Sequence, residues 1–191
     1  FSQPDSNTAT SYFTAASFLA YGNNLKVVRA VGVNGKNASA NPSTTTQVTN
    51  EDQFQYSYLN NLTNGNTYGA FLARYSGALG NSLTVSVVDA ASWSTSWTVN
   101  GVGVSSYFAG APGTSTAAGL VGASNDQIHI VVMDTTGLIS GTKNTVLETF
   151  PFLSKASDGI DTTNNTSNYW KQVIFNKSQY IYVVDPVDYS N

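Results

Sequence analysis

The sequence predicts an α+β fold, in which a mixed β-sheet or a two-layer β-sandwich is flanked by short helices. The strongest observation is a continuous apolar strand that begins near Ile128 and runs into a glycine-containing turn by Gly137. Its apolar residues point to both faces, which is typical of a strand covered on both sides. Several other runs alternate with a period of two, and the helix-like segments between them are short. More strand than helix is therefore expected.

The N-terminal part is predicted to contain one helix and one strand. The helix runs from Asp5 to Gly22, with Asp5 or Ser6 as the N-cap and Gly22 as a left-handed stop. Residues 25–31 then alternate as a strand. The following segment, residues 32–49, is rich in Gly, Asn, Ser and Thr and is predicted to be a loop.

The middle of the chain is predicted to hold a helix, two strands and a hairpin. The helix starts at Thr49 or Asn50 and ends near Tyr58, with Glu51 and Asp52 in its first turn. A turn over residues 76–81 separates strands at 68–75 and 83–87. Asn100-Gly101 suits the two positive-φ positions of a type I′ turn, so residues 97–104 are predicted to form a hairpin.

The C-terminal half is predicted to contain two further strands and a short helix. Residues 108–124 and 158–168 are expected to be irregular. Strands are predicted at 146–153 and 179–184, with a helix at 169–175 between the exposed loop and the last strand.

Composition excludes several classes of function. Only 10 % of the 191 residues are charged, against roughly a quarter in an average soluble domain. The basic residues are scattered singly and the net charge is −3, which argues against direct nucleic-acid binding. No apolar run approaches the ~20 residues of a membrane span. The lack of cysteine excludes disulfides and thiolate metal sites, and it suits assembly in a reducing cytoplasm.

His129 is the only histidine, so any histidine-dependent catalysis must use it. A Ser-His-Asp arrangement with Asp134 is conceivable, but His129 lies within an apolar strand and no Gly-x-Ser-x-Gly elbow occurs. We therefore interpret His129 as a structural residue that is hydrogen-bonded within the sheet.

The carboxylates give no clear catalytic pair. A glycosidase would need two of them roughly 5 to 9.5 Å apart. The only glutamates are Glu51 and Glu148. The aspartates mostly lie at caps and turns, where carboxylates are usually structural. The aspartates that flank predicted strand ends are Asp89, Asp126, Asp134 and Asp185. Whether two of these carboxylates meet in a cleft is left open by the sequence. Phosphate-loop, zinc and EF-hand spacings are absent. The sequence thus predicts no catalytic, cofactor-binding or metal-binding residue, and no enzyme.

Two surface features are candidates for modification or binding sites. A chain rich in Asn, Ser and Thr produces Asn-x-Ser/Thr triplets by chance, so no glycosylation is expected. Five such triplets occur, and they begin at Asn37, Asn61, Asn164, Asn165 and Asn176. Trp93, Trp97 and Tyr107 are candidates for stacking on sugars, although aromatic residues near strands more often pack against their neighbours.

Several motifs, taken in order, resemble one family. The first motif comprises Phe1-Ser2-Gln3-Pro4, then Tyr12-Phe13, then residues 18–31, which read FLAYGNNLKVVRAV. The second is residues 73–83, which read ARYSGALGNSL. The third is residues 111–115, APGTS, which precede the Ile128 strand. This series resembles the contractile-tail sheath proteins of T-even-type bacteriophages, including their marine members. Ser2 and Ser76 stand where that family usually has glycine and proline.

The resemblance implies a structural role. Sheath subunits polymerise around a tail tube, and contraction drives the tube through the host envelope. It also implies that residues 1–31 form the edge of an inner domain and residues 32–191 a protruding outer domain, with an additional inserted domain reduced or absent at about 32–49. The expected partners are other sheath subunits, with the tail tube and baseplate contacted by regions outside this chain. The chain alone is expected to be monomeric, in a virion protein assembled in the host cytoplasm. A receptor- or carbohydrate-binding module is the alternative.

Overall fold

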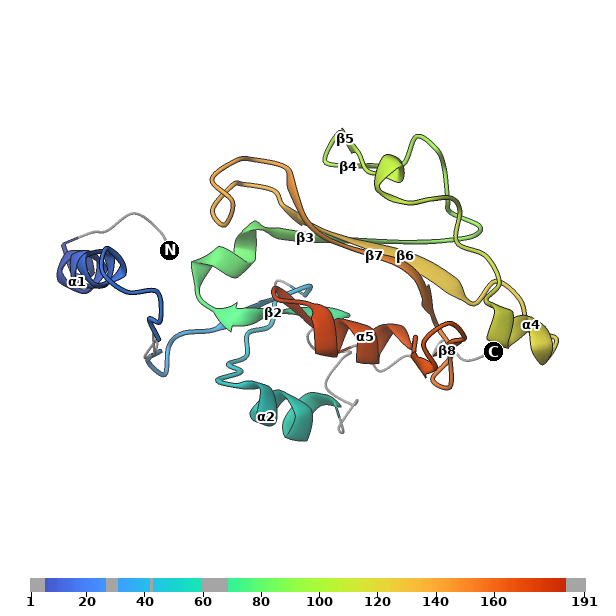
Figure 1. The fold of residues 1–191 in the computed structure, drawn as a ribbon, viewed down its shortest axis with the longest axis horizontal. Coiled ribbons are helices and arrows are strands. Elements are labelled where there is room, and N and C mark those ends of the chain that lie inside the picture. Colours follow the sequence, from blue (N-terminus) through green and yellow to red (C-terminus); the bar gives the residue numbers. More distant parts are fainter. Residues whose placement is uncertain (1–5, 27–30, 42, 60–68, 185–191) are drawn as a thin grey trace. The chain divides into compact units, whose positions relative to one another are not determined.

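The computed structural model describes residues 6–26, 31–41, 43–59 and 69–184 (Figure 1). It divides into two compact units, Phe1–Asn34 and Gly35–Asn191. Helix α1, Ala9–Leu19, belongs to the first unit. The strands β1 to β10 belong to the second unit. The assignment of residues 1–31 and 32–191 to an inner and an outer sheath domain stays a prediction.

Helix α1 is shorter than the sequence predicted, and its ends are formed differently. Thr8 is the N-cap, without a side-chain hydrogen bond, so the prediction of Ser6 was wrong; Asp5 lies outside the described residues. At the other end, the N–H groups of Tyr21 and Gly22 both donate to the Phe18 carbonyl. This tight last turn needs no left-handed residue, and the role predicted for Gly22 was also wrong. Of the predicted strand 25–31, residues 27–30 lie outside the described residues and the other three are not in a strand.

The larger sheet has the order β3-β6-β7, with every pairing antiparallel. Its strands are β3, Leu83–Asp89; β6, Gln127–Asp134; and β7, Thr145–Ser154. β6 is central and buried from Ile128 to Asp134, which confirms the prediction of a strand covered on both faces. Figure 1 shows these three long strands side by side.

The smaller sheet has the order β1-β2-β10 and is also antiparallel. Its strands are β1, Asn37–Ser39; β2, Phe71–Ser76; and β10, Ile181–Val183. β1 lies within the segment 32–49 that was predicted to be a loop. Three residues carry no readable periodicity, and the strand is held by pairing with β2 and by side-chain hydrogen bonds of Asn37.

Two helices flank the smaller sheet. The first, α2, Glu51–Phe54, begins as predicted: the Asn50 side chain accepts a 2.7 Å hydrogen bond from the Gln53 N–H, and Glu51 and Asp52 occupy the first turn. It continues as a π-helical turn, η1, Gln55–Leu59. The second, α5, Trp170–Lys177, confirms the helix predicted near residues 169–175.

The remaining elements are short. A 3₁₀ turn, η3, Ala78–Ser82, joins β2 to β3, and another, η4, Ser105–Tyr107, follows the predicted hairpin of β4, Thr98–Val99, and β5, Val102–Gly103. Asn100 and Gly101 have φ of 50° and 80°, as a type I′ turn requires.

Two segments predicted to be irregular contain regular structure. Residues 158–168 include the hairpin of β8, Ile160–Asp161, and β9, Thr166–Ser167, and residues 108–124 include α4, Thr116–Leu120. The helix is short but fully capped, because Ser115 Oγ accepts from the Ala118 N–H, and Gly122 with φ of 77° closes a Schellman turn.

Three apolar clusters hold the second unit together. The first joins one face of β6 and β7 to α5 and β10, through Ile130, Phe150 and Ile174 among others. The second packs Phe54 of α2 against Leu72 and Tyr182. The third covers the other face of β6 with the β4-β5 hairpin. The α+β class is confirmed, and its strands form several small antiparallel sheets.

Candidate functional site

His129 is fully buried, and the protein backbone occupies both of its ring nitrogens. Nδ1 accepts a 2.9 Å hydrogen bond from the Phe152 N–H, so the proton lies on Nε2, which is 2.9 Å from the Gly110 carbonyl. Burial lowers the pKa of His129, and the Gly110 hydrogen bond only partly opposes this effect. No lone pair is left for a serine, so the residue cannot act as a general base in this state.

The histidine also holds an irregularity in β7. Phe152 has a φ of 53°, which is uncommon for a bulky residue, and the register between β6 and β7 shifts between Ile128 and Ile130. At this bulge the imidazole takes the place of a backbone acceptor for the Phe152 N–H. The ring is stacked on Phe108, with 4.3 Å between the ring centroids.

Asp134, at the end of β6, organises the loop between β6 and β7. One carboxylate oxygen accepts from the Ser82 hydroxyl and the Gly137 N–H, and the other accepts from Ile139 N–H and from both donors of Ser140. Burial alone would raise the pKa of Asp134. The donors of Ser140, Ser82 and Ile139 outweigh that effect and lower the pKa to about 2. The carboxylate is therefore ionised and fully bound, as suits a turn-forming residue and not an acid catalyst.

Asp126, just before β6, plays a similar part. Its carboxylate accepts 2.7 Å hydrogen bonds from the Ser115 N–H and the Ser154 hydroxyl. Burial raises its pKa, but these donors prevail and the net shift is downward. Through Ser115 it connects β6 to the start of α4.

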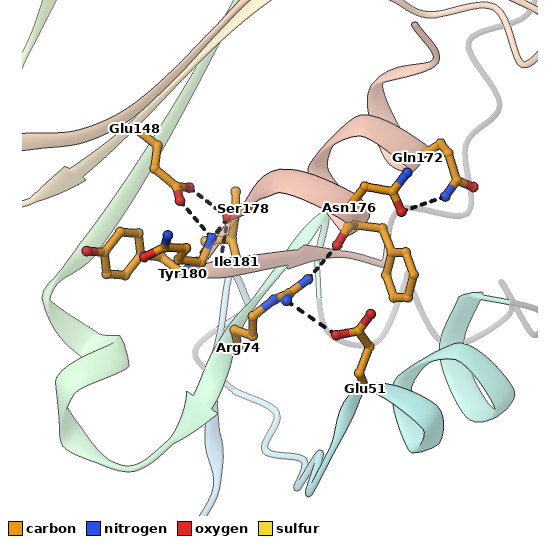
Figure 2. A network of polar contacts seen from close by, with 10 residues as sticks. Glu51, Arg74, Glu148, Gln172, Asn176, Ser178, Tyr180 and Ile181 are labelled. Atoms are coloured by element: carbon orange, nitrogen blue, oxygen red, sulfur yellow. Dashed lines mark hydrogen bonds and ion pairs between the residues drawn. The ribbon is translucent and has the colours of Figure 1, made fainter. Parts of the chain in front are cut away.

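Figure 2 shows two charged side chains, Glu148 and Arg74, that connect α5 and the turn after it to their surroundings. Glu148 of β7 accepts from the Ser178 hydroxyl and the Gln179 N–H, both at 2.7 Å, and so fixes the turn between α5 and β10. Arg74 of β2 donates from Nη2 to the Phe175 carbonyl at 2.6 Å. This cation satisfies a carbonyl in the last turn of α5.

Arg74 also contacts two other elements. Its guanidinium carbon lies 4.4 Å above the ring centroid of Tyr182 in β10, and Nη1 is 3.6 Å from the half-exposed Glu51 carboxylate at the start of α2. One arginine thus links α2, α5, β2 and β10. Sequence reasoning placed Arg74 in a motif but gave it no role. One indication was available in the sequence. Arg74 lies on the same face of the predicted strand as Leu72, and a charged side chain beside an apolar one needs polar partners.

The remaining carboxylates considered as catalytic candidates lie apart in the chain, and each described one has its own structural partner. Asp89 accepts from the Ser92 N–H and hydroxyl in a turn, Glu51 pairs with Arg74, and Asp185 lies outside the described residues. Within the described ranges, no three His, Asp or Glu side chains form a group that could hold a metal ion. Of the carboxylates within those ranges, Asp89 alone lines the groove described next.

A shallow groove of about 280 Å³ lies beside the edge of the larger sheet. Its lining is Ala70, Phe71, Val87, Asp89, Ser92, Ile128, Lys155 and Trp170. The lining offers one carboxylate and one ammonium group, so it lacks the two acids that glycoside hydrolysis requires.

The tryptophans proposed as sugar platforms are packing residues. Trp93 contacts Trp97 and the His129 ring, with centroid distances of 6.0 and 5.4 Å, and both indoles cover the third cluster. Tyr107 is 55 % exposed and stands outside that cluster. An array of open aromatic faces, as a sugar site needs, is therefore not formed by these three residues.

The asparagine triplets differ in environment. Asn37 is buried, and its amide nitrogen donates to the Ala73 carbonyl, so it cannot present itself to a modifying enzyme. Asn164, Asn165 and Asn176 are exposed, and Asn61 lies outside the described residues. Among the described residues no helix is long and apolar enough to cross a membrane.

Comparison with known proteins gives a distant similarity to a phage protein. The chain is 27 % identical over 146 residues to a tail sheath protein of Salmonella phage ViI. The match covers 76 % of this chain but only 20 % of that protein, so the chain spans about a fifth of the length of the relative. No family model matches the chain. The chain is thus distantly similar to a phage tail sheath protein.

Proposed function

We propose that this chain is part of a subunit of a contractile tail sheath of the T-even type, whose polymer contracts around the tail tube. The observation that carries the proposal is the ordered series of sheath-like motifs together with the similarity over 146 residues. The polypeptide would be a virion protein that takes part in genome ejection and host entry without enzymatic activity of its own.

The motif around residues 73–83 supports this role because its residues build the fold. Arg74 links four elements, as described above. Gly77 has a φ of 112°, which favours glycine. At Gly80 an added Cβ would lie 2.6 Å from the Cβ of Ala73, so no larger residue fits there. The motif therefore specifies how β2 turns into β3.

The motifs around residues 111–134 also serve packing. Gly113 N–H donates to the Gln127 side chain, Ser115 caps α4, His129 fixes the bulge in β7, and Asp134 fixes the next loop. A sheath stores free energy in two alternative packings of its subunits and not in nucleotide hydrolysis, so it needs subunits of defined shape. Motif residues that fix shape fit this mode of action.

Residues 32–191 would form the protruding outer domain, and residues 1–31 would form the edge of the inner domain. The additional inserted domain would be reduced or absent at about 32–49. Neighbouring sheath subunits would be the direct partners, while the tail tube and baseplate would be contacted by regions outside this chain. Assembly would occur in the host cytoplasm.

Electron microscopy of the complete polypeptide that contains this chain tests the proposal. We expect striated tubes, decorated along their outer surface by antibody fragments raised against residues 35–184. Decoration confined to a tail tip or fibre would instead support the receptor-binding alternative. A complete polypeptide that stays unassembled and binds glycans would contradict the sheath role.

The chain alone gives a second test. Because regions that link subunits would be missing, we expect size-exclusion chromatography with light scattering to show a monomer. A stable ring or tube formed by the chain alone would contradict the assignment of residues 32–191 to an outer domain.

A further inference from the structure

Three Asn-Gly pairs occur in the sequence, at 34–35, 64–65 and 100–101. Such a pair is a site of spontaneous chemistry, because a glycine carries no side chain to shield its nitrogen from the preceding asparagine. The structure describes the first and third pairs, and it places them in opposite environments. Asn64-Gly65 lies outside the described residues.

Asn34 and Gly35 are free to react. Asn34 is exposed in a turn with Val33, whose side chain is 80 % exposed. Within the described residues, the Asn34 amide makes no hydrogen bond, and neither does the Gly35 N–H. The peptide bond between them is also where the chain passes from its first compact unit to its second.

Asn100 and Gly101 have the same sequence but are held in place. Both lie in the type I′ turn between β4 and β5, with φ of 50° and 80°. The Asn100 amide donates a 2.9 Å hydrogen bond to the hydroxyl of Thr135, beyond the end of β6. For the glycine nitrogen to reach Cγ, this hydrogen bond must break and the turn must distort.

We propose that Asn34 is a site of self-modification to aspartate and isoaspartate, and that Asn100 is protected from the same reaction. The Gly35 nitrogen, after losing its proton to a base, attacks Cγ of Asn34 and ammonia leaves, which gives a five-membered succinimide. Water then opens either ring carbonyl. The balance is one amide and one water consumed, and one carboxylic acid and one ammonia formed.

The product changes the connection between the two units in two ways. The net charge goes from −3 to −4, since one neutral side chain becomes an acid. Isoaspartate also routes the main chain through the side chain, which adds a methylene group. One residue after Gly35 the chain is fixed again, because the Lys36 carbonyl accepts a 2.8 Å hydrogen bond from the Gly77 N–H, and buried Asn37 then donates to the Ala73 carbonyl. The modified bond therefore lies directly before the first fixed residues of the second unit.

Peptide mapping by mass spectrometry tests the inference, with an isoaspartate-specific methyltransferase as a second readout. The purified chain is incubated under native conditions at mildly alkaline pH, and each Asn-Gly pair is followed in its own peptide. We expect Asn34 to convert roughly tenfold faster than Asn100, a ratio equivalent to about 1.4 kcal/mol and close to the net value of one hydrogen bond. Equal rates, or a faster Asn100, would overturn the inference.

Two controls separate structure from sequence. In denaturant the two rates should converge, and a difference that persists there would show that the fold is not its cause. Gly35→Val should suppress conversion at Asn34 alone. Thr135→Val should accelerate conversion at Asn100 alone, and an unchanged rate in this folded variant would contradict the protection assigned to the hydrogen bond. If Thr135→Val does not fold, the native and denatured comparison of the unaltered chain still decides.

Discussion

The central strand of the larger sheet and an edge strand of the smaller sheet are buried by different kinds of side chain. In the larger sheet the central strand β6 buries Ile128, Ile130 and Val132 against α5 on one face. In the smaller sheet the short strand β1 buries the amide of Asn37, and the central strand β2 carries the Arg74 guanidinium. Strand β6 is therefore held mainly by apolar area, whereas strand β1 depends more on the directed polar contacts of Asn37.

This difference shows that similar architecture can respond to mutation in different ways. Truncating an apolar side chain removes transfer free energy and leaves a cavity. Removing a buried polar group leaves its former partners without hydrogen bonds, which costs the desolvation of each. All three tryptophans, Trp93, Trp97 and Trp170, belong to the second unit, so their fluorescence during urea unfolding reports on both sheets and not on α1.

The largest expected effect is in the core of the larger sheet. Ile130→Ala should lower the free energy of unfolding by about 4 kcal/mol, because Ile130 is fully buried in the first cluster and its neighbours close the cavity only in part. The midpoint of urea unfolding measures the change. Ile160→Ala, at a residue that is 42 % exposed, is the matched control and should shift the midpoint far less. Equal shifts would mean that burial does not govern stability here.

In the smaller sheet the corresponding residue is polar. Asn37→Ala should cost about 3 kcal/mol, since it leaves the Val48 N–H, the Ala73 carbonyl and the Ser76 hydroxyl without their partner. Asn164→Ala, on the surface, serves as the control. If Asn37→Ala lowered the free energy of unfolding no more than the control does, water would be replacing the amide. The contrast between the two strands would then be contradicted.

Asp134 makes the larger sheet sensitive to acid. Its pKa is about 2 in the folded state and 3.8 as the ordinary value. Its stabilisation, about 2 kcal/mol, is complete above the ordinary value and is lost as the pH falls through 3.8 towards 2. Asp134→Asn should remove this part of the acid dependence and lower stability at neutral pH. Urea unfolding at several acidic pH values measures it, and an unchanged acid dependence would contradict the network.

His129 should produce a smaller effect at milder pH. Because its pKa is lowered in the folded state, the unfolded chain binds the proton first, and stability falls as the pH drops below about 6.5. The loss grows as the pH falls and levels off below the lowered pKa of the folded state. His129→Asn, whose side chain does not titrate, should flatten this slope. A slope that persists in the variant would assign it to another group.

Glu51 should matter least. Its contact with Arg74 is 3.6 Å long and its side chain is 55 % exposed, so Glu51→Gln should change the free energy of unfolding by less than about 0.5 kcal/mol. A much larger shift would show that the ion pair itself, and not the Phe175 carbonyl or Tyr182, is the main partner of Arg74. Raising the salt concentration should leave the unaltered chain nearly as stable.

Residues whose structure is specified locally could be predicted from the sequence. The apolar run of β6, the Asn-Gly hairpin at residues 100–101 and the Asn50 cap of α2 each depend on periodicity or on a turn of a few residues. The caps of α1 were predicted wrongly because several arrangements can satisfy the same few backbone groups. The short strands β1, β8 and β9 were missed because two or three residues carry no period.

The sequence by itself determined the α+β class, the central buried strand and the resemblance to tail sheath proteins, since these depend on the order of residues along the chain. Only the tertiary structure decided that Arg74 links four elements, that His129 fixes a bulge and that the side chains of Asn34 and Asn100 lie in different environments. Those properties depend on partners far away in the sequence, such as Phe175 for Arg74 and Thr135 for Asn100. A buried polar group takes its role from what lies within hydrogen-bonding distance, and local periodicity carries no record of that distance.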